Sequence, residues 1–494
     1  MMTMRRWALA AFAAMSTAAS GQQVARGPVA QREVAVPTSD SIVARLIDEG
    51  TNRSHVEQDL SYLLDVIGPR LSGTPEMRRA NEWTQQKFRE YGMDRAELES
   101  WKFGVAWTRG PMTIRMLAPH HREMIGVSWA WAPGTNGPIA GPVVYLDART
   151  TAEFNRRFSG KLKGAWVMIG PSYAIANPDG PATHADSIRV DSLRRERLAR
   201  NDDESHYLQV RGALLIKEGI AGAIQDGGKE FGLLTMSGSP GAILPYPMIV
   251  IGNEDYSQFE RLSKRREPVR IEVDIKNTFT PNEIDQYNTV AEIRGSEKPN
   301  EVVLLGAHLD SWDLATGGTD NGTGSIAVLE AARILKAAGI KPKRTIRFVL
   351  FSGEEQGLLG SQSYAADHQK ELDKFQAVLV LDNGTGRITG MALQGRDELK
   401  DMWAAMLQAA TPLGPLSLRS GQKTGTDHLA FIPYGVPSFN YDQLTRGYNH
   451  THHSQVDDYD HTVPTDVAQA ATIMAINAWQ LADMRDLLPR GPKQ

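Results

Sequence analysis

The chain has 494 residues, of which 41% are hydrophobic and 23% charged, and its formal net charge is −4. A chain of this length exceeds the size at which one hydrophobic core keeps growing, so we expect at least two domains. The small net charge excludes the strongly basic footprint of a nucleic-acid-binding protein. The sequence contains no cysteine, which excludes disulfides and leaves nitrogen and oxygen as the ligand atoms for any metal.

The first 20 residues have the pattern of a secretory signal peptide. Arg5 and Arg6 form a basic start, an apolar run of about a dozen residues follows, and small residues precede Gly21. We therefore expect cleavage near Ser20 and export, either as a secreted protein or into a bacterial periplasm. The apolar run is shorter than the roughly 20 helical residues that span a bilayer, so we expect no membrane anchor after signal removal.

The rest of the chain is predicted to contain one domain that is interrupted by another. We expect a loose leader at residues 21–38 and the first part of a domain at residues 39–119. An insertion is expected at residues 120–283, and the main part of the first domain at residues 284–494. In the first part, the spacing of apolar residues predicts helices over about 39–65 and 76–91.

The insertion is predicted to be rich in β-structure. Short runs of Val, Ile and Leu, separated by charged or glycine-rich loops, predict four strands at about 141–146, 164–169, 223–224 and 247–252. One helix is expected over 211–222.

The main part of the interrupted domain alternates strands with helices. Apolar strands are expected at about 301–306, 345–351, 376–381 and 437–441, and helices at about 324–338, 357–368, 397–410 and 464–482. This alternation predicts an α/β fold with a mostly parallel central sheet flanked by helices. In such sheets, ligands bind beyond the carboxyl ends of the strands.

Acidic and imidazole side chains follow these strands at the expected ends. They are His308, Asp320, Glu354, Glu355, Asp382 and His453. Each has an ordinary explanation when it is taken alone: a buried histidine bonded to a carboxylate, a helix N-cap, or a solvated acidic pair. Taken together they favour a two-metal hydrolase, because adjacent carboxylates at the end of a buried strand are costly without cations.

The residue types suggest how such a site would act. Asp310 would fix the ring of His308 from behind, and one free carboxylate would lie beside the ions. Two cations lower the pKa of a water that they share. Oxygen ligands with two imidazoles suit zinc, so we expect two Zn²⁺ per chain, with Mn²⁺ or Co²⁺ as substitutes.

These motifs resemble metallopeptidase family 28, which includes co-catalytic zinc aminopeptidases and proteins similar to plasma glutamate carboxypeptidase. The resemblance covers about 287–481 and the segment around 68–83, and rests on Gly-Ala-His-Leu-Asp-Ser at 306–311, Asp-Asn-Gly-Thr-Gly at 320–324 and Glu-Glu-Gln-Gly at 354–357. It implies that Asp320 bridges both ions. It also implies that His308 and Asp382 complete one site, that Glu355 and His453 complete the other, and that Glu354 is the base.

The resemblance has further implications for the chain. The peptide bond between Asp320 and Asn321 is expected to be cis, and His453 is preferred to His452 because it fits the register His-Ser/Thr-x-x-Asp. The insertion resembles a protease-associated domain that roofs the cleft, although a plain spacer remains an alternative.

Substrate contacts are less specified by the sequence. Some relatives place a tyrosine just before the Ser/Thr-Asp-His motif, and here Gln422 to Thr426 contain none. Candidates for contacting the substrate are His452, Asp427, His428 and Tyr448, with Tyr441 as another tyrosine for the missing role.

Several functions remain open at this stage. The leading interpretation is an exported aminopeptidase that acts on peptide substrates, and the alternative is a carboxypeptidase or dipeptidase resembling plasma glutamate carboxypeptidase. A non-catalytic binding ectodomain, as in the transferrin receptor, would require lost ligands. A family-20 type metallopeptidase is disfavoured because only 12 positions separate His308 from Asp320. The oligomeric state is left open.

Overall fold

The computed structural model describes residues 36–173 and 201–493. The predicted signal peptide and most of the predicted leader lie outside the described residues. The chain divides into two compact units: one comprises Asp147–Lys163 and the described part of 176–219, and the other comprises the remaining described residues. The smaller unit contains α4 (Thr151–Arg157) and α6 (Asp202–Glu218), which pack on each other.

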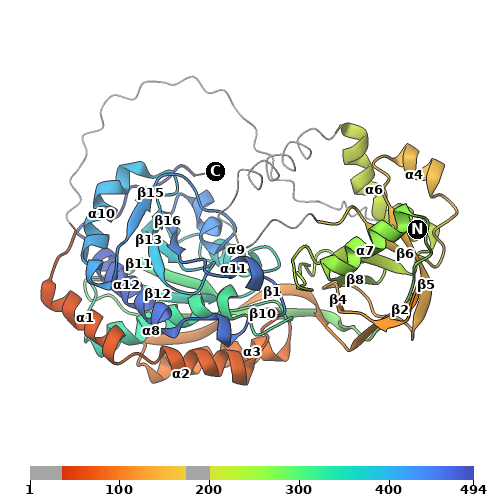
Figure 1. Cartoon of the computed structure of the whole chain (residues 1–494). Helices are drawn as coiled ribbons and strands as arrows, with labels where there is room; N and C mark the ends of the chain where they lie inside the picture. The colour runs from red at the N-terminus through yellow and green to blue at the C-terminus, as the bar shows by residue number, and fades with distance from the viewer. Residues whose placement is uncertain (1–35, 174–200, 494) are drawn as a thin grey trace. The chain divides into compact units, whose positions relative to one another are not determined.

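The larger unit contains two sheets, and the first has eight strands. Their order is β1 (Arg95–Thr108), β10 (Thr278–Ile293), β12 (Arg344–Phe351), β11 (Lys298–His308), β13 (Phe375–Val380), β16 (Ser438–Gln443), β14 (Ile388–Ala392) and β15 (Ser417–Arg419). The four inner strands, from β12 to β16, are mutually parallel (Figure 1). Antiparallel pairing occurs towards both edges, between β1, β10 and β12 and between β14 and β16. The predicted α/β fold is therefore confirmed, and its parallel character belongs to the centre of the sheet.

Helices cover this sheet, and its central strands are buried on both faces. Every residue of β12 and β13 is buried. The described helices of this part are α1 (Asp40–Asn52), α2 (Val56–Ser61), α3 (Pro75–Glu90), α8 (Thr323–Ala337), α9 (Leu359–Asp367), α10 (Lys400–Gln408), α11 (Tyr448–Thr451) and α12 (Pro464–Asp483). α8 packs along α12 and α1, and both α8 and α12 contact β11 and β12. α8 and α12 are almost wholly buried, as expected for helices pressed between a sheet and other helices.

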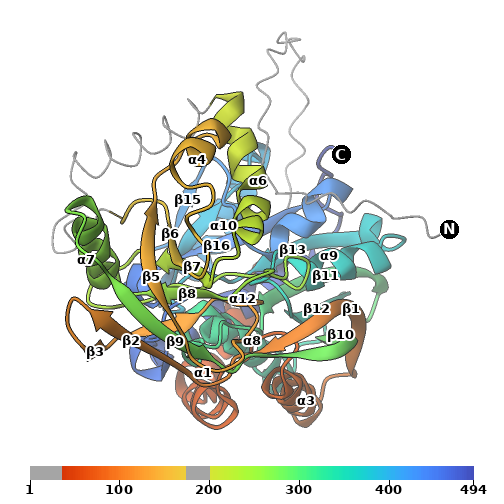
Figure 2. The same cartoon turned by 90° about the vertical axis from the view of Figure 1, so that its right-hand side faces the viewer.

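The second sheet also has eight strands. Their order is β3 (Arg122–Glu123), β2 (Met112–Ala118), β9 (Arg270–Ile275), β5 (Ile139–Leu146), β6 (Trp166–Ile169), β7 (Gly222–Asp226), β8 (Met248–Ile251) and β4 (Gly126–Ser128). Strands β5 to β8 are parallel and the others pair antiparallel. The helix α7 (Asn253–Lys264) contributes Tyr256 and Phe259 to the core beside this sheet (Figure 2). The interpretation of this part as a protease-associated domain stays a prediction.

Several elements differ from the sequence prediction, and two of them are instructive. The long antiparallel strands β1 and β10 were not expected, although the alternation of charged residues such as Glu97 and Glu99 with apolar ones in β1 is the pattern of a half-buried strand; the prediction relied on continuous apolar runs. Helix α6 begins nine residues before the expected start at 211, since its first turn is acidic and is capped by the side chain of Asn201, which accepts a hydrogen bond from Glu204 N. Both differences concern polar, partly exposed segments.

We searched the described residues for a membrane-spanning helix. None of their helices combines the length and the apolar character that crossing a bilayer requires.

Candidate metal centre

The candidate ligands lie beyond the carboxyl ends of three adjacent strands. His308 is the last residue of β11, Glu355 follows β12, and Asp382 follows β13. Because β12, β11 and β13 are neighbouring parallel strands, their carboxyl ends meet at one edge of the sheet. Asp320 lies in the turn Gly318–Gly322, whose backbone is not helical at Asp320 and Asn321, directly before α8, and His453 follows α11.

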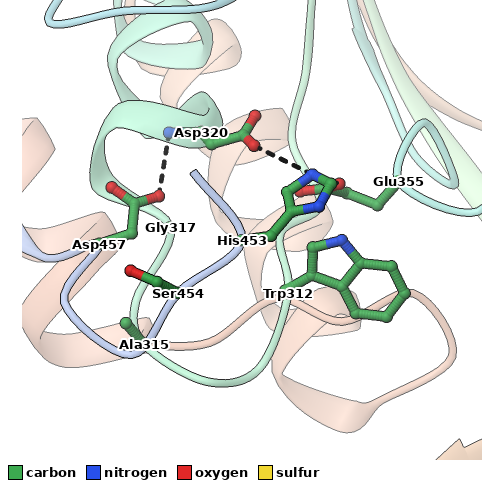
Figure 3. Close-up of a pocket in the computed structure, with 8 residues that line it drawn as sticks. All are labelled: Trp312, Ala315, Gly317, Asp320, Glu355, His453, Ser454 and Asp457. Atoms are coloured by element: carbon green, nitrogen blue, oxygen red, sulfur yellow. Dashed lines mark hydrogen bonds and ion pairs between the residues drawn. The ribbon is translucent and has the colours of Figure 1, made fainter. Parts of the chain in front are cut away.

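The structure brings all five candidate ligands together. The Nε2 atom of His308 lies 3.3 Å from Oδ1 of Asp320 and 3.4 Å from Oδ1 of Asp382. On the other side, Nε2 of His453 lies 3.4 Å from Oδ2 of Asp320 and 2.8 Å from Oε2 of Glu355 (Figure 3). The two oxygens of Asp320 therefore face two different sets of ligands, which is the arrangement of a bridging carboxylate.

The two histidines present their Nε2 atoms to the centre because their other nitrogens are occupied. Nδ1 of His308 lies 3.0 Å from the carbonyl oxygen of Asp310, and Nδ1 of His453 lies 3.1 Å from the carbonyl oxygen of Met236. A carbonyl only accepts, so each Nδ1 donates a proton, and in the neutral form of the ring Nε2 then offers its lone pair to a metal. Histidine ligands of metals are commonly oriented in this way.

The donor set fits divalent cations. Nε2 of His308, Oδ2 of Asp320, Oε1 of Glu355 and Oδ1 of Asp382 are buried, and none has a hydrogen-bond partner among the described residues. Burial raises the pKa of Glu355 well above its ordinary value, and the nearby carboxylate of Asp320 adds to the effect. Buried polar atoms are costly when they are unpaired, and cations between them would remove that cost. One imidazole and two carboxylates on each side suit zinc.

Asp310 supports the site through a contact that differs from the expected one. Its carboxylate was predicted to hold the ring of His308, but Oδ1 lies 3.7 Å from Nδ1, and the backbone carbonyl makes the short contact instead. The carboxylate accepts hydrogen bonds from the backbone N–H groups of Glu354 and Glu355, at 3.3 and 3.4 Å, and from Ser72. Asp310 therefore orients the turn that carries both glutamates. Burial raises the pKa of Glu354 well above its ordinary value.

The turn that carries Asp320 is held by a second buried carboxylate. Asp457 accepts hydrogen bonds from the backbone N–H and the hydroxyl of Thr319, both at 2.7 Å, and from the N–H of Asp320 at 3.1 Å. The peptide bond from Asp320 to Asn321 is cis, as expected. The turn leaves no room for a side chain at Gly318, where a Cβ atom would lie 2.4 Å from the carbonyl oxygen of Asp458.

Arg70 is a buried residue of the site region that sequence reasoning missed. Its guanidinium donates to the carbonyl oxygens of Leu309, Thr316 and Gly317, which belong to the loop between His308 and Asp320. Burial lowers its pKa to about 10, although the nearby carboxylates, Asp457 first among them, oppose this change. The signal in the sequence is an arginine inside the turn Gly-Pro-Arg-Leu-Ser-Gly, where a loop arginine would usually be solvated.

The residues predicted to contact substrate fall into two groups. His452 and Tyr448 lie beside the centre. The side chain of His452 is 44% exposed, and its Nε2 lies 3.7 Å from Oδ2 of Asp320. The hydroxyl of Tyr448 lies 3.5 Å from Oδ1 of Asn383. Asp427 and His428 are instead fully buried. Burial raises the pKa of Asp427 to about 7 and lowers that of His428 to about 4.

The two tyrosines considered for the missing role also separate. Tyr441 is fully buried, and its hydroxyl donates to Oδ1 of Asn477 on α12 at 2.9 Å. The ring of Tyr448 lies 5.1 Å from that of His452, so Tyr448 is the tyrosine that borders the centre. Burial and the charge of Asp320 raise the pKa of its hydroxyl well above the ordinary value.

Comparison with known proteins agrees with this geometry. Residues 288–478 match the sequence pattern of the family described as Peptidase family M28. Carboxypeptidase Q of Mus musculus is 28% identical over 445 residues, which are 89% of this chain and 87% of that protein. Aminopeptidase YwaD of Bacillus subtilis (strain 168) is 30% identical over 211 residues, which are 39% of this chain and 45% of that protein.

Solved structures share the fold. A Peptidase M28 precursor from Shewanella amazonensis SB2B has a TM-score of 0.73 at 26% identity, covering 92% of this chain and 99% of that chain. BSAP, a zinc aminopeptidase from Bacillus subtilis, has a TM-score of 0.61 at 21% identity, covering 88% and 98%. The match over residues 288–478 identifies this part of the chain as a Peptidase family M28 domain, which is a hydrolase that acts on peptide bonds.

Proposed function

We propose that the chain is an exopeptidase with two zinc ions. His308 and Asp382 would hold one ion, Glu355 and His453 the other, and Asp320 would bridge both. The observation that carries this proposal is that the two carboxylate oxygens of Asp320 face different histidines. Its Oδ1 lies 3.3 Å from Nε2 of His308, and its Oδ2 lies 3.4 Å from Nε2 of His453.

The metal count has a direct test. Metal analysis of the full-length mature protein after dialysis against zinc should find two ions per chain. Fewer than one ion per chain, together with no hydrolysis of any dipeptide or aminoacyl-nitroanilide, would instead support a non-catalytic binding protein.

The catalytic roles follow from the positions of the side chains. Bound zinc supplies the Lewis acidity that polarises the scissile carbonyl and acidifies a water. Glu354 takes the proton of the attacking water and returns it to the leaving amine, because its carboxylate is outside both ligand sets and its backbone is fixed by Asp310. The protonated hydroxyl of Tyr448 donates to the oxyanion that develops from the carbonyl oxygen, and His452, exposed beside Asp320, contacts the substrate.

We favour a carboxypeptidase or dipeptidase specificity. The supporting observation is the extent of the similarity to Carboxypeptidase Q of Mus musculus, which covers 89% of this chain and 87% of that protein. The test compares dipeptides whose amino end is blocked with dipeptides whose carboxyl end is amidated. A carboxypeptidase releases amino acids from the N-blocked set and fails on the amidated set, whereas a dipeptidase fails on both sets and cleaves only dipeptides with two free ends.

Aminopeptidase action, the expectation from the sequence, remains the second candidate. It is supported by the 30% identity to Aminopeptidase YwaD over 211 residues, which include only part of each chain. In the same experiment, cleavage of the amidated set and no cleavage of the N-blocked set would establish it.

We further propose that the protein is exported, because residues 1–20 have the pattern of a signal peptide. Mass spectrometry of the protein from an expressing bacterium would test this. An exported chain should begin near Gly21 and be recovered outside the cytoplasm, whereas a chain that retains Arg5 and Arg6 in the cytoplasm would contradict export.

A further inference from the structure

One segment of the second sheet reaches the loop that carries His453. This segment, residues 227–236, follows β7 and precedes β8, and it contains none of the candidate ligands. It makes hydrogen bonds with residues 450–455 through four residues of its own: Lys229, Gly232, Leu234 and Met236.

The side chain of Gln455 forms the centre of this contact. Its Oε1 accepts from the N–H of Leu234 at 2.8 Å, and its Nε2 donates to the carbonyl oxygen of Gly232 at 3.0 Å. One side-chain amide thus satisfies two backbone groups, as a neighbouring strand would. Gln455 occupies an unspecified position of the His-Ser-x-x-Asp pattern, so the pattern itself gives it no role.

Two further contacts fix the same loop. The Nζ atom of Lys229 donates to the carbonyl oxygens of His450, at 3.2 Å, and His452. The carbonyl oxygen of Met236 accepts from Nδ1 of His453 at 3.1 Å. Together these contacts hold the loop on both sides of the ligand.

Apolar packing makes the segment a firm support. Leu234 and Met236 are almost fully buried in a cluster that includes Trp131 and Trp312. The ring of Trp312 also packs edge-on against the ring of His453, with centroids 5.9 Å apart (Figure 3). The segment is thus anchored in a tryptophan-rich core.

The backbone of His453 needs such support. Its φ is +57°, a left-handed conformation that costs a residue with a Cβ atom about 1 kcal/mol or more. Conformations of this kind persist where the surroundings hold them in place.

We propose that residues 227–236 are part of the metal centre, with Gln455 and Lys229 as positioning residues that hold His453 at its ion. The inference rests on the proposed two-zinc function and extends it. It gives the second sheet a defined task, which is to fix the direction in which Nε2 of His453 points.

The decisive variant is Gln455→Leu in the full-length mature protein. It removes both amide hydrogen bonds without changing charge. Affinity for Co²⁺ and Zn²⁺ is measured by competition with a chelator and by the absorption of bound Co²⁺. We expect a 10- to 100-fold weaker affinity, roughly the effect of losing an outer partner of a ligand, at the same ion that His453→Ala loses. The other ion should bind as in the unchanged protein.

A matched amide variant serves as the control. Gln408→Leu lies at the exposed end of α10, and it should leave both affinities unchanged. Equal affinities in Gln455→Leu and the unchanged protein would overturn the inference. Failure of the proposed function is a separate result, because the unchanged protein would then bind fewer than two ions.

A second pair of variants decides the matter if Gln455→Leu does not fold. Lys229→Met removes a positive charge near Asp320, which by itself would strengthen cation binding. A weaker affinity in Lys229→Met would therefore report the loosened loop, and Lys229→Arg should restore it, since a guanidinium also donates to two carbonyls. A tighter affinity in Lys229→Met, or no rescue by arginine, would overturn the inference.

Discussion

At the scale of single residues, the centre is built from side chains that interrupt apolar sequence. Asp382 follows a strand of six buried residues, and Glu354 and Glu355 follow a strand of eight. Such interruptions are visible in the sequence, because a carboxylate at a buried strand end needs a partner. The hydrogen-bond partners of the ligands could not be predicted where those partners are backbone atoms. The carbonyl of Met236 lies 217 positions from His453, and no residue type marks it.

Glu354→Gln should abolish most of the hydrolysis while the metal remains bound. Glutamine has the same shape but cannot take a proton, and general base catalysis typically contributes roughly 10²- to 10⁴-fold. We expect kcat to fall by this factor with two zinc ions retained. Steady-state kinetics with metal analysis of the same sample would check both points. A decrease in kcat of less than tenfold would exclude Glu354 as the base.

Tyr448→Phe should lower kcat by roughly 10²-fold and change KM little, because its hydroxyl is proposed to act on the developing oxyanion. Tyr441→Phe is the matched control, since its hydroxyl bonds Asn477 in the core and should affect stability instead of kcat. Steady-state kinetics on a dipeptide and thermal unfolding distinguish the two variants. Equal kcat values in the two variants would show that Tyr448 does not stabilise the oxyanion.

At the scale of elements, the centre depends on turns more than on helices and strands. The turn Gly318–Gly322 presents Asp320, and Asp457 holds it from a loop about 137 positions away, a separation that the sequence does not reveal. Helices α8 and α12 were predicted within a residue or two because their apolar content is high throughout. The strands β1 and β10 were not predicted, because they lack the continuous apolar runs that marked the central strands; the alternation of polar and apolar residues in β1 is the signal that could have found it.

Gly318→Ala should distort the turn that presents Asp320. The new Cβ would lie 2.4 Å from the carbonyl oxygen of Asp458, which is backbone and cannot move away freely. We expect an unfolding free energy lower by about 1–3 kcal/mol and weaker zinc binding. Gly241→Ala is the control, because the nearest atom to a Cβ atom there would be Oγ of Ser239 at 3.8 Å, which is an ordinary van der Waals contact. Thermal melts with and without zinc would measure both effects, and an unchanged zinc affinity would contradict this account.

At the scale of the whole molecule, charged networks join segments that are distant in sequence. His368, at the end of α9, contacts Glu99 of β1 at 2.8 Å and Glu371 at 2.5 Å, and Glu371 also pairs with Arg347 of β12. Burial opposes the charged imidazole, but the hydrogen bonds with Glu371 and Glu99 outweigh it and raise the pKa of His368 to about 9. The side chain is 19% exposed, so solvent screening is limited.

The raised pKa predicts how stability depends on pH. The unfolded chain has an imidazole pKa of about 6.5, so the stabilisation is complete below that pH and disappears as pH rises through about 9. The pH-dependent part should amount to about 3 kcal/mol at most. His368→Gln should therefore lower the unfolding midpoint in urea at pH 6 far more than at pH 10, while the exposed His121→Gln serves as control. An equal decrease at both pH values would contradict the assignment.

The wide spacing of the ligands has a consequence for truncated chains. Between the first and the last of them lie about 145 positions, which include strands β12, β13 and β16 of the sheet. A truncated chain that stops before His453 keeps four of the five proposed ligands and lacks one. The proposed site is therefore complete only in a chain that also contains β16 and the loop that follows it.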